Sequence, residues 1–350
     1  MSAPAIPASI QDITPAWLSE VTGLDVQGLE AEQIGVGIGV SSALYRLRLD
    51  GKGCPATVVV KLPALDEAAV FTSTMLRFYI REVGFFNHLA ADSPIRVPAC
   101  HHAVVDEETS RFVVVMEDLS GLRAIDQVAG MALSDAERAI DELAAWHARW
   151  WRQADPLVAS GLAVSLADPI YPAVLPLVFG EGWDKVRAAM PVADSIAAVA
   201  PRFGAAIGAL MASLAVPPTT VIHGDFRADN LLFDAGGRVA LLDFQIIGAG
   251  SGSYDLAYFV TQSLDPDVAR QSERALFDRW LEGLRRGGVT EADLERLWED
   301  YQTAALFCLV YPIVASRGMD LSDPRQYDLV NCMNSRIARA IEEHDLGRLI

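Results

Sequence analysis

The sequence predicts an α+β fold in two parts, a small antiparallel sheet that carries one helix and a larger, mainly helical domain. Four short strand-like runs lie in the first third of the chain, and one helical segment separates the first two from the last two. The strands are residues 39–50, 56–62, 99–106 and 111–117, and the helix is residues 74–90. After Leu119 the pattern is helical to the C-terminus, apart from residues 221–245.

This pattern divides the chain into three segments. Residues 1–32 are predicted to be an N-terminal extension with one short helix between Thr14 and Gly23. Residues 33–119 form the domain that contains the sheet, and residues 120–350 form the helical domain.

Composition restricts the class of protein. The 350-residue chain is 51% hydrophobic and 21% charged, as is usual for a soluble globular protein. Its net charge of -18 argues against a nucleic-acid partner, because phosphate backbones are bound by clustered Lys and Arg. The N-terminus lacks a secretory signal, and the longest uncharged apolar run, residues 203–216, is too short to span a bilayer. Four scattered cysteines are typical of free thiols. We therefore expect a cytoplasmic protein with no membrane partner.

The segment 222–245 carries the most chemical information. Asp225 is followed five residues later by Asn230, and turn-forming residues 234–237 connect two apolar strands that lead to Asp243. Because a hairpin returns to its origin, Asn230 and Asp243 are expected side by side. An amide oxygen and a carboxylate suit Mg²⁺, which is usually bound together with nucleotide phosphates.

The spacing agrees with the kinase signature H-R-D-L-x-x-x-N followed by D-F-G, which here reads HGDFRADN and DFQ. The alternative is that HGD forms a chance turn and that Asp243 caps a helix, but both halves of the signature occur in order. The sequence therefore predicts phosphoryl transfer from ATP, with Asp225 as the catalytic base and with Asn230 and Asp243 as ligands of Mg²⁺.

If this segment holds the base and the metal, the N-terminal sheet should bind ATP. The glycine-rich residues 35–42 lie just before a strand. Glycines let backbone N–H groups approach phosphate closely, which makes Gly37, Gly39, Ser41 and Ser42 candidate ligands. The spacing departs from G-x-G-x-x-G, so a hairpin tip without a ligand is the alternative.

Two further features of the sheet domain suit a nucleotide. Lys61 ends an apolar strand, where an unpaired ammonium would be costly, and Glu82 on the next helix is its best partner. Such a pair directs the Lys toward the α- and β-phosphates, whereas a surface Lys is the alternative. Glu117, Asp118 and Leu119 lie where the chain crosses between the domains, and we expect them to bind the adenine edge mainly through backbone groups.

On these motifs the chain resembles the aminoglycoside phosphotransferase and choline kinase-like superfamily, over roughly residues 33–345. The segments YIREVGFF and MEDL and the triplet DFQ look most like the ecdysteroid-kinase-like branch. The resemblance implies a protein-kinase-like two-lobe fold, with a nucleotide-binding N-terminal lobe and an acceptor pocket in the C-terminal lobe. It also implies that Asp255, in the sequence SYDLA, braces the catalytic loop.

Two departures from protein kinases concern the acceptor. Gly224 stands where protein kinases carry an Arg that clamps a phosphorylated activation loop, and only eleven residues separate Asp243 from Asp255. No segment for docking a peptide fits there, so a small-molecule hydroxyl acceptor is predicted. Arg227, two positions after the base, occupies the place of a Lys that often contacts the γ-phosphate, and we predict a catalytic role for it.

The sequence favours an apolar hydroxylated acceptor. Acidic residues between Asp265 and Asp300 are interleaved with arginines, which indicates a solvated helix face and not a trap for a polycation. Aromatic candidates for the pocket, each of which could equally be core, are Tyr171, Phe179, Trp183, Trp298 and Tyr311. The alternatives are an aminoglycoside- or choline-type kinase, a nucleotide-binding pseudokinase that acts as an interaction protein, and a protein kinase.

Overall fold

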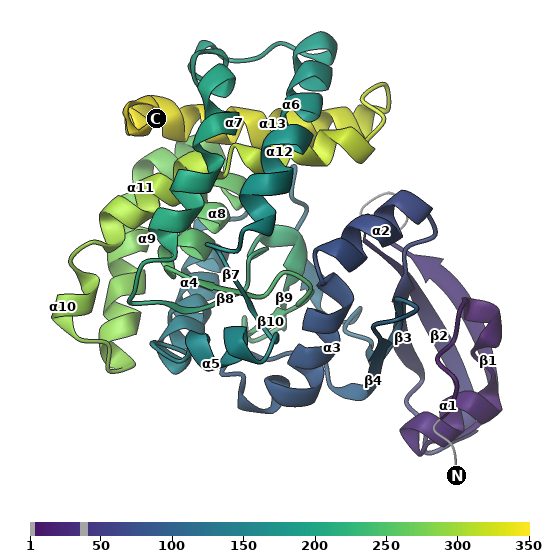
Figure 1. The fold of residues 1–350 in the computed structure, drawn as a ribbon. Coiled ribbons are helices and arrows are strands. Elements are labelled where there is room, and N and C mark those ends of the chain that lie inside the picture. The colour runs from purple at the N-terminus through teal and green to yellow at the C-terminus, as the bar shows by residue number, and fades with distance from the viewer. Residues whose placement is uncertain (1–3, 36–40) are drawn as a thin grey trace. The chain divides into compact units, whose positions relative to one another are not determined.

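The computed structural model describes residues 4–35 and 41–350, apart from the side chains of residues 292 and 293. The chain forms two compact units (Figure 1). Unit 1 contains Met1–Leu122 and Leu241–Ile246, and unit 2 contains Arg123–Ala240 and Ile247–Ile350. The segment 241–246 therefore belongs to unit 1 by its contacts, although it lies in the middle of the helical part of the sequence.

Unit 1 is built on a five-stranded sheet in the order β1-β2-β3-β5-β4, in which all neighbours are antiparallel. The strands are β1 (Asp25–Ile34), β2 (Ser42–Lys52), β3 (Thr57–Pro63), β4 (Cys100–Asp106) and β5 (Arg111–Glu117). The helices are α1 (Pro15–Thr22), α2 (Glu67–Met75) and α3 (Phe78–His88), with short 3-10 turns η1 (Ile10–Asp12) and η2 (Ala90–Asp92).

The sequence predicts β2 to β5 but not β1, whose residues it assigns mostly to an N-terminal extension. β1 is an edge strand with mostly exposed side chains, so its sequence lacks the apolar alternation of a half-buried strand. A bulge between Val26 and Gly28 also interrupts the two-residue period. The short helix of this segment is confirmed as α1, with Thr14 as its N-cap and Gly23 at its C-terminus.

The single helix predicted over residues 74–90 is wrong, because two helices, α2 and α3, meet at a break. Arg77 in this break has a left-handed backbone with φ 58°. Arg81, which lies on α3, stabilises this break, because its Nη2 donates to the carbonyl of Leu76 at 2.8 Å. No Gly or Pro marks the position, so helical periodicity could not locate it.

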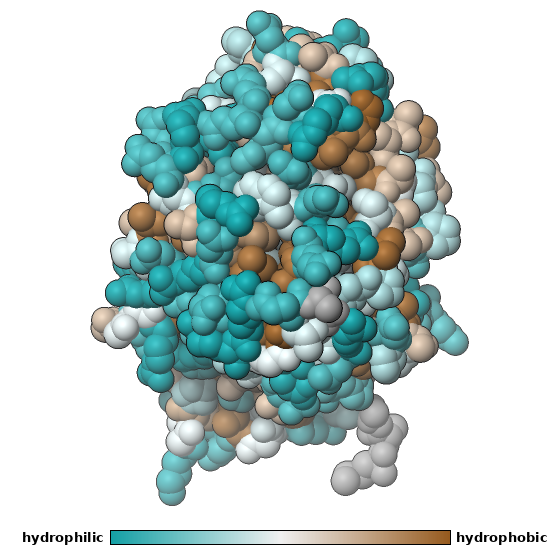
Figure 2. Space-filling view, turned by 90° about the vertical axis from the view of Figure 1, so that its left-hand side faces the viewer, coloured by the Kyte–Doolittle hydropathy of each residue, from teal (hydrophilic) through white to brown (hydrophobic). Residues whose placement is uncertain are grey.

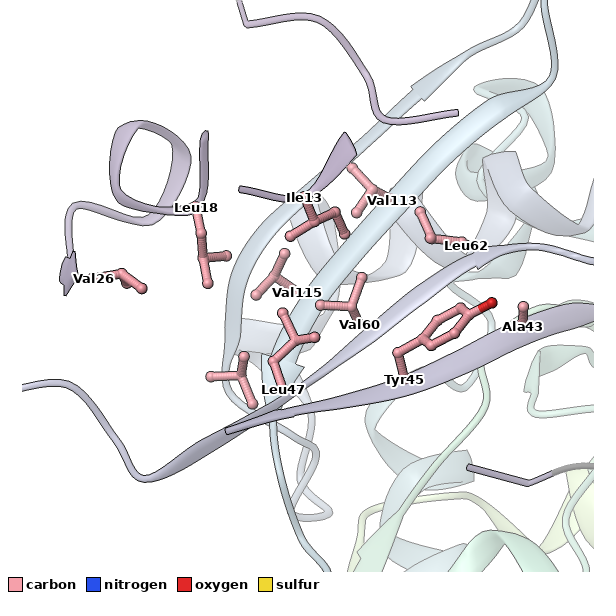
Figure 3. Close-up of a cluster of buried hydrophobic side chains, with 11 residues drawn as sticks. Ile13, Leu18, Val26, Ala43, Tyr45, Leu47, Val60, Leu62, Val113 and Val115 are labelled. Atoms are coloured by element: carbon pink, nitrogen blue, oxygen red, sulfur yellow. The ribbon is translucent and has the colours of Figure 1, made fainter. Parts of the chain in front are cut away.

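Figure 3 shows the core of unit 1. Ile13 and Leu18, from the N-terminal segment, join side chains of β2, β3 and β5 in one buried cluster. Leu47, Val60 and Val115 of these strands are completely buried. Ile13 and Leu18 are therefore part of the core of unit 1 and contribute to its stability.

Unit 2 is mainly helical. Its helices are α4 (Leu133–Arg149), α5 (Ala154–Ala159), α6 (Ile170–Ala189), α7 (Asp194–Leu214), α8 (Ser253–Ser263), α9 (Pro266–Arg286), α10 (Glu291–Leu294), α11 (Leu297–Phe307), α12 (Val310–Ala315) and α13 (Pro324–Glu343), with 3-10 turns η3 (Ala228–Asn230), η4 (Ser316–Gly318) and η5 (Leu346–Leu349). Its strands are β6 (Arg123–Ala124), β7 (Val164–Ser165), β8 (Thr220–Ile222), β9 (Leu231–Phe233), β10 (Val239–Leu241) and β11 (Gly248–Gly250). They form two small sheets, β10-β9-β6 and β7-β11-β8.

The hairpin predicted after Asn230 is confirmed by β9 and β10. The N–H of Asp234 donates to Arg238 O at 3.0 Å, and the N–H of Gly237 donates to Asp234 O at 2.9 Å. Gly237 has φ 81°, a conformation that glycine adopts without strain.

Every residue of α8 is buried, and the helix packs against α9, α11 and α13. A buried helix with polar residues needs partners for them. Ser253 Oγ, for example, donates to Leu297 O at 2.8 Å. The polar residues Asp255, Tyr258 and Ser263 hold the loop described below.

α7 is long and apolar enough by length and composition to cross a membrane, but its side chains are distributed as in a core helix. Bulky residues such as Phe203, Ile207 and Leu210 are buried, whereas Ala205 and Ala209 are exposed. The helix packs against α6 and α11.

The charged residues on α9 and α10 form exposed ion pairs. Arg274 Nη2 lies 3.1 Å from Asp278 Oδ1, and Arg285 Nε lies 2.5 Å from Glu291 Oε1. The face of the molecule in Figure 2 is mostly hydrophilic, with scattered apolar side chains. These pairs agree with the solvated helix face predicted for this region.

A buried ionic cluster joins α9, α11 and the C-terminal end of α13. Glu273 accepts hydrogen bonds from the hydroxyl of Tyr301 at 2.5 Å, from Arg339 Nη1 at 2.6 Å and from His344 Nε2 at 2.9 Å. Burial opposes the charge on Glu273, but the bonds from His344 and Arg339 outweigh burial and lower the pKa of Glu273 to about 2.

We expect this cluster to make the free energy of unfolding depend on pH in the acidic range. The pKa of Glu273 is about 2 in the folded protein against 4.5 ordinarily, so its ionisation contributes about 3 kcal/mol, which is present above pH 4.5 and is lost as the pH falls toward 2. Glu273→Gln is expected to be less stable at neutral pH and to lose less stability on acidification. Denaturant unfolding at neutral pH and at about pH 3 measures both effects. The exposed Glu299→Gln is the control, and equal acid dependence in wild type and Glu273→Gln would contradict the prediction.

Candidate active site

The residues predicted for the site lie in both units. Unit 1 holds Ser41, Ser42, Lys61, Glu82, Glu117, Asp118, Leu119 and Asp243, and unit 2 holds Asp225, Arg227 and Asn230. Gly37 and Gly39 lie outside the described residues.

The predicted Lys61–Glu82 pair is present in unit 1. Lys61 Nζ on β3 lies 2.7 Å from Glu82 Oε1 on α3 and 3.2 Å from Asp243 Oδ1. The side chains of Lys61 and Glu82 are almost fully buried, whereas that of Asp243 is 37% exposed. Three residues that are far apart in the sequence thus form one charged cluster.

This cluster carries one more negative than positive charge. Burial opposes the ammonium charge, but the carboxylates of Asp243 and Glu82 raise the pKa of Lys61 above its ordinary value, so it stays charged. Burial raises the pKa of Glu82, Lys61 opposes this rise, and Asp243 adds to it. Asp243 is the more exposed of the two carboxylates and is therefore the one accessible to a further cation.

The triplet Asp243-Phe244-Gln245 is held in unit 1 by all three side chains. Asp243 contacts Lys61, and Phe244 stacks on Phe85 with ring centroids 3.6 Å apart. Gln245 Nε2 lies 3.2 Å from Glu82 Oε2. Asp243 has φ 64°, a left-handed conformation that Asp adopts more readily than most residues.

Residues 117–119 are held by side-chain and backbone hydrogen bonds. Glu117 Oε1 accepts from Arg96 at 2.8 Å, and Asp118 Oδ2 accepts from Arg46 Nε at 2.7 Å. The N–H of Glu117 donates to Ala99 O at 2.8 Å. An adenine contact by Glu117, Asp118 or Leu119 stays a prediction.

In unit 2, Asp225 lies on the loop between β8 and η3, and three side chains hold its carboxylate. Oδ1 accepts from Arg227 Nε at 3.0 Å and from the hydroxyl of Tyr258 at 2.7 Å. Oδ2 accepts from Asn230 Nδ2 at 2.8 Å. A carboxylate oxygen accepts about two hydrogen bonds, so Oδ2 retains the capacity for one more.

Arg227 is bound between two carboxylates. Its Nη1 lies 2.6 Å from Asp229 Oδ2, and its Nε contacts Asp225. Burial opposes its charge, but Asp225, Tyr258 and Asp229 together outweigh burial and raise the pKa of Arg227, so it is always protonated. Asn230 donates through Nδ2, which leaves its carbonyl oxygen as the atom that could coordinate a metal.

Asp255 braces the loop, as the resemblance implies. Its carboxylate accepts the backbone N–H of His223 at 2.6 Å and of Gly224 at 2.8 Å, and it lies 3.1 Å from His147 Nε2. Trp280 Nε1 donates to His147 Nδ1 at 3.0 Å. Since Trp only donates, His147 carries its proton on Nε2 and donates it to Asp255.

Gly224 is required by the backbone at this bend. It has φ 85°, which side chains other than glycine adopt only with strain. Gly224, which stands where protein kinases carry an Arg, therefore also lets the backbone turn so that the Asp255 carboxylate accepts two consecutive N–H groups.

The sequence-based expectations did not include Tyr258, whose hydroxyl donates to Asp225, although they named Tyr311 as a pocket candidate. Tyr258 stacks on Tyr311 with ring centroids 3.9 Å apart, and the Tyr311 hydroxyl bonds to that of Tyr254 and donates to Gly224 O at 3.2 Å. Burial and the Asp225 charge raise the pKa of Tyr258 well above its usual range, so its hydroxyl stays a donor. The signal in the sequence was helical spacing, because Tyr258 follows Asp255 by three residues.

Only some of the aromatic pocket candidates lie near these tyrosines. Tyr311 contacts Tyr258, and Tyr171 lies near enough to Tyr254 to influence its ionisation. Phe179 is buried against Phe203 in the core. Trp298 stacks on Tyr301 beside the Glu273 cluster, and Trp183 is half-buried on α6. Among the described residues, no ring contact links either tryptophan to Tyr258 or Tyr311.

Comparison with known proteins identifies the class of enzyme. The chain belongs to the phosphotransferase enzyme family, which it matches over residues 32–297. The family predicted from the motifs is therefore confirmed, and the chain is a small-molecule kinase, as the family assignment implies. The ecdysteroid-kinase-like branch stays a prediction. No curated protein matches the chain.

Solved structures share the fold. The GDP and kanamycin complex of APH(2″)-IIIa is 14% identical with a TM-score of 0.56, over 92% of this chain and 97% of that one. A choline/ethanolamine kinase family protein from Mesorhizobium loti is 15% identical with a TM-score of 0.52, over 95% and 96% of the two chains. The ethanolamine kinase from Plasmodium vivax is 12% identical with a TM-score of 0.52, over 89% and 82%. At these identities the likeness establishes the fold, and the predicted kinase-like α+β architecture is confirmed.

Asp255 is expected to protect the backbone of the catalytic loop from solvent exchange. In Asp255→Ala the N–H groups of His223 and Gly224 lose their acceptor, so these two amides should exchange at least 10-fold faster. Hydrogen exchange with mass spectrometry of peptides that cover residues 221–226 measures this. Peptides from unit 1 are the internal control, and unchanged exchange at 223–224 would contradict the prediction.

The hydroxyl of Tyr258 is expected to orient Asp225 for the reaction. Tyr258→Phe removes one hydrogen bond from Oδ1 and should lower kcat about 10-fold, with little change in the KM for nucleotide. Tyr254→Phe is the matched control, because it removes a buried hydroxyl from the same helix that does not contact Asp225. Steady-state release of ADP measures both variants, and an equal loss in the two would assign the effect to packing.

Proposed function

We propose that the protein is an ATP- and Mg²⁺-dependent phosphotransferase that moves the γ-phosphate to a hydroxyl of a small organic molecule. The observation that carries the proposal is the Asp225 carboxylate, which is fixed by Arg227, Tyr258 and Asn230 and keeps one acceptor position on Oδ2. A carboxylate held in this way in a phosphotransferase is suited to orient a hydroxyl and accept its proton.

The reaction assigned to these residues is an in-line displacement. The acceptor O–H bond breaks, its oxygen bonds to the γ-phosphorus, and its proton passes to Asp225 Oδ2. The bond from the γ-phosphorus to the β–γ bridging oxygen breaks, and ADP leaves. Lys61 would bind the α- and β-phosphates, because Glu82 holds its ammonium in a fixed position.

Arg227 has a double role in this proposal. Its Nε and Nη1 are bound by Asp225 and Asp229, which places a permanent cation beside the carboxylate of the base. Nη2 is then the nitrogen that would contact the γ-phosphate.

The donor atoms at Asp243 and Asn230 fit Mg²⁺. Asp243 offers a part-exposed carboxylate in a cluster with excess negative charge, and Asn230 offers its amide oxygen. When bound, Mg²⁺ would neutralise charge on the β- and γ-phosphates.

The surroundings of Asp225 favour a neutral, partly apolar acceptor. Tyr258 and Tyr311 stack beside the base, and the carboxylate of Asp229 is paired with Arg227. An aminoglycoside is a polycation and would need unpaired carboxylates. Along α9 and α10, Asp278 and Glu291 are paired with arginines. We therefore propose an apolar hydroxylated metabolite as the acceptor.

The test combines product detection with a variant of the base. Wild type and Asp225→Asn are incubated with Mg²⁺, γ-labelled ATP and a metabolite extract, and phosphorylated products are identified by mass spectrometry. We expect a labelled small molecule in the wild type and a loss of at least 100-fold in Asp225→Asn, because the base is removed while its shape is kept. Mg-ATP affinity, measured by calorimetry, should change little, because Asp225 is not assigned to nucleotide binding.

The result also separates the alternatives. A labelled aminoglycoside or choline-type product would replace the proposed acceptor class, and label on protein would indicate a protein kinase. Mg-ATP binding without any labelled product, when authentic apolar alcohols, aminoglycosides and choline have been supplied, would support the pseudokinase.

A further inference from the structure

Gln245, the last residue of the DFQ triplet, is a buried amide with every hydrogen-bonding group engaged. It is 4% exposed and lies two residues after Asp243. Its Oε1 accepts from Ser41 Oγ at 2.5 Å, and its Nε2 donates to Ser42 Oγ at 2.6 Å and to Glu82 Oε2 at 3.2 Å. One acceptor and two donors are thus used by three partners in unit 1.

The orientation of the amide follows from chemistry. Glu82 Oε2 is a carboxylate oxygen and can only accept, so the nitrogen of Gln245 must face it. Glu82 Oε1 is bound by Lys61. Gln245 therefore holds the one oxygen of Glu82 that Lys61 does not, and the two together fix the carboxylate.

Ser41 and Ser42 differ in whether the hydroxyl proton is already donated within the network. Ser41 gives its proton to Gln245, and its carbonyl accepts from Tyr79 Oη at 2.9 Å and Ser73 Oγ at 3.4 Å. Ser41 is therefore an anchor. Ser42 accepts from Gln245, so its own hydroxyl proton can be donated to another acceptor, such as a phosphate oxygen.

We propose that Gln245 is a positioning residue for the Mg-nucleotide. Its side chain connects Ser41 and Ser42, at the end of the glycine-rich segment, with the Lys61–Glu82 pair and the triplet that contains Asp243. Loss of its bonds would free Ser42 and Glu82 together. This role rests on the proposed function, since it assumes that unit 1 binds a nucleotide.

The test measures nucleotide binding directly and needs no acceptor. Gln245→Met keeps the side-chain length but removes all three hydrogen bonds. Its Kd for Mg²⁺ with a non-hydrolysable ATP analogue, measured by calorimetry, should rise about 10-fold, which corresponds to ~1.4 kcal/mol. Gln33→Met, at an exposed position on β1, is the matched control and should bind like the wild type.

Ser42→Ala breaks the same link from the other side and keeps the proposal testable if Gln245→Met does not fold. Both single variants should weaken binding, and the double variant should lose little more than the weaker-binding single variant, because the residues act as one unit. Thermal unfolding of each apo protein separates a folding defect from a binding defect.

The outcomes distinguish this proposal from the proposed function. A Kd of Gln245→Met within twofold of wild type, with normal binding by the wild type, overturns the role of Gln245 alone. Fully additive losses in Gln245→Met and Ser42→Ala also overturn it, because independent residues are not joined by one network. A wild-type protein that binds no Mg-nucleotide overturns both proposals.

Discussion

The buried ammonium of Lys61 is the constraint on which unit 1 depends. A charge at the end of an apolar strand must be compensated, and here Glu82 on α3 and Asp243 on the segment 241–246 both reach it. Because Lys61 needs these partners, α3 and the segment 241–246, which comes from the second half of the sequence, both contact the same sheet. Gln245 completes the arrangement, because it satisfies the second oxygen of Glu82 and extends the network to Ser41 and Ser42.

Unit 2 uses a buried helix for the same purpose. α8 supplies Asp255 for two backbone N–H groups, Tyr258 for the Asp225 carboxylate and the Ser263 hydroxyl for the N–H of Ala228. A loop that a buried helix holds at three points is preorganised, and preorganised electrostatics is how the proposed function would accelerate phosphoryl transfer. In the proposed mechanism the acceptor therefore meets a base whose orientation is already fixed.

Much of the site follows from local sequence patterns. The spacing of His223, Asp225 and Asn230 and the apolar strand before Lys61 are readable because the chemistry needs those side chains at those intervals. Tyr258 and Gln245 were harder to find, because their partners lie 33 and 163 residues away along the chain. β1 was missed since an exposed edge strand carries little hydrophobic signal.

By itself the sequence determined the α+β class, the strands β2 to β5, the hairpin after Asn230 and the kinase-like family, because periodicity, turn residues and motif spacing are local properties. Only the tertiary structure decided that residues 241–246 pack in unit 1, that the helix after β3 breaks at Arg77 and that Gln245 bonds to three side chains. Such features depend on which distant groups meet once a buried charge or donor needs a partner, and no window of sequence contains both sides of that contact.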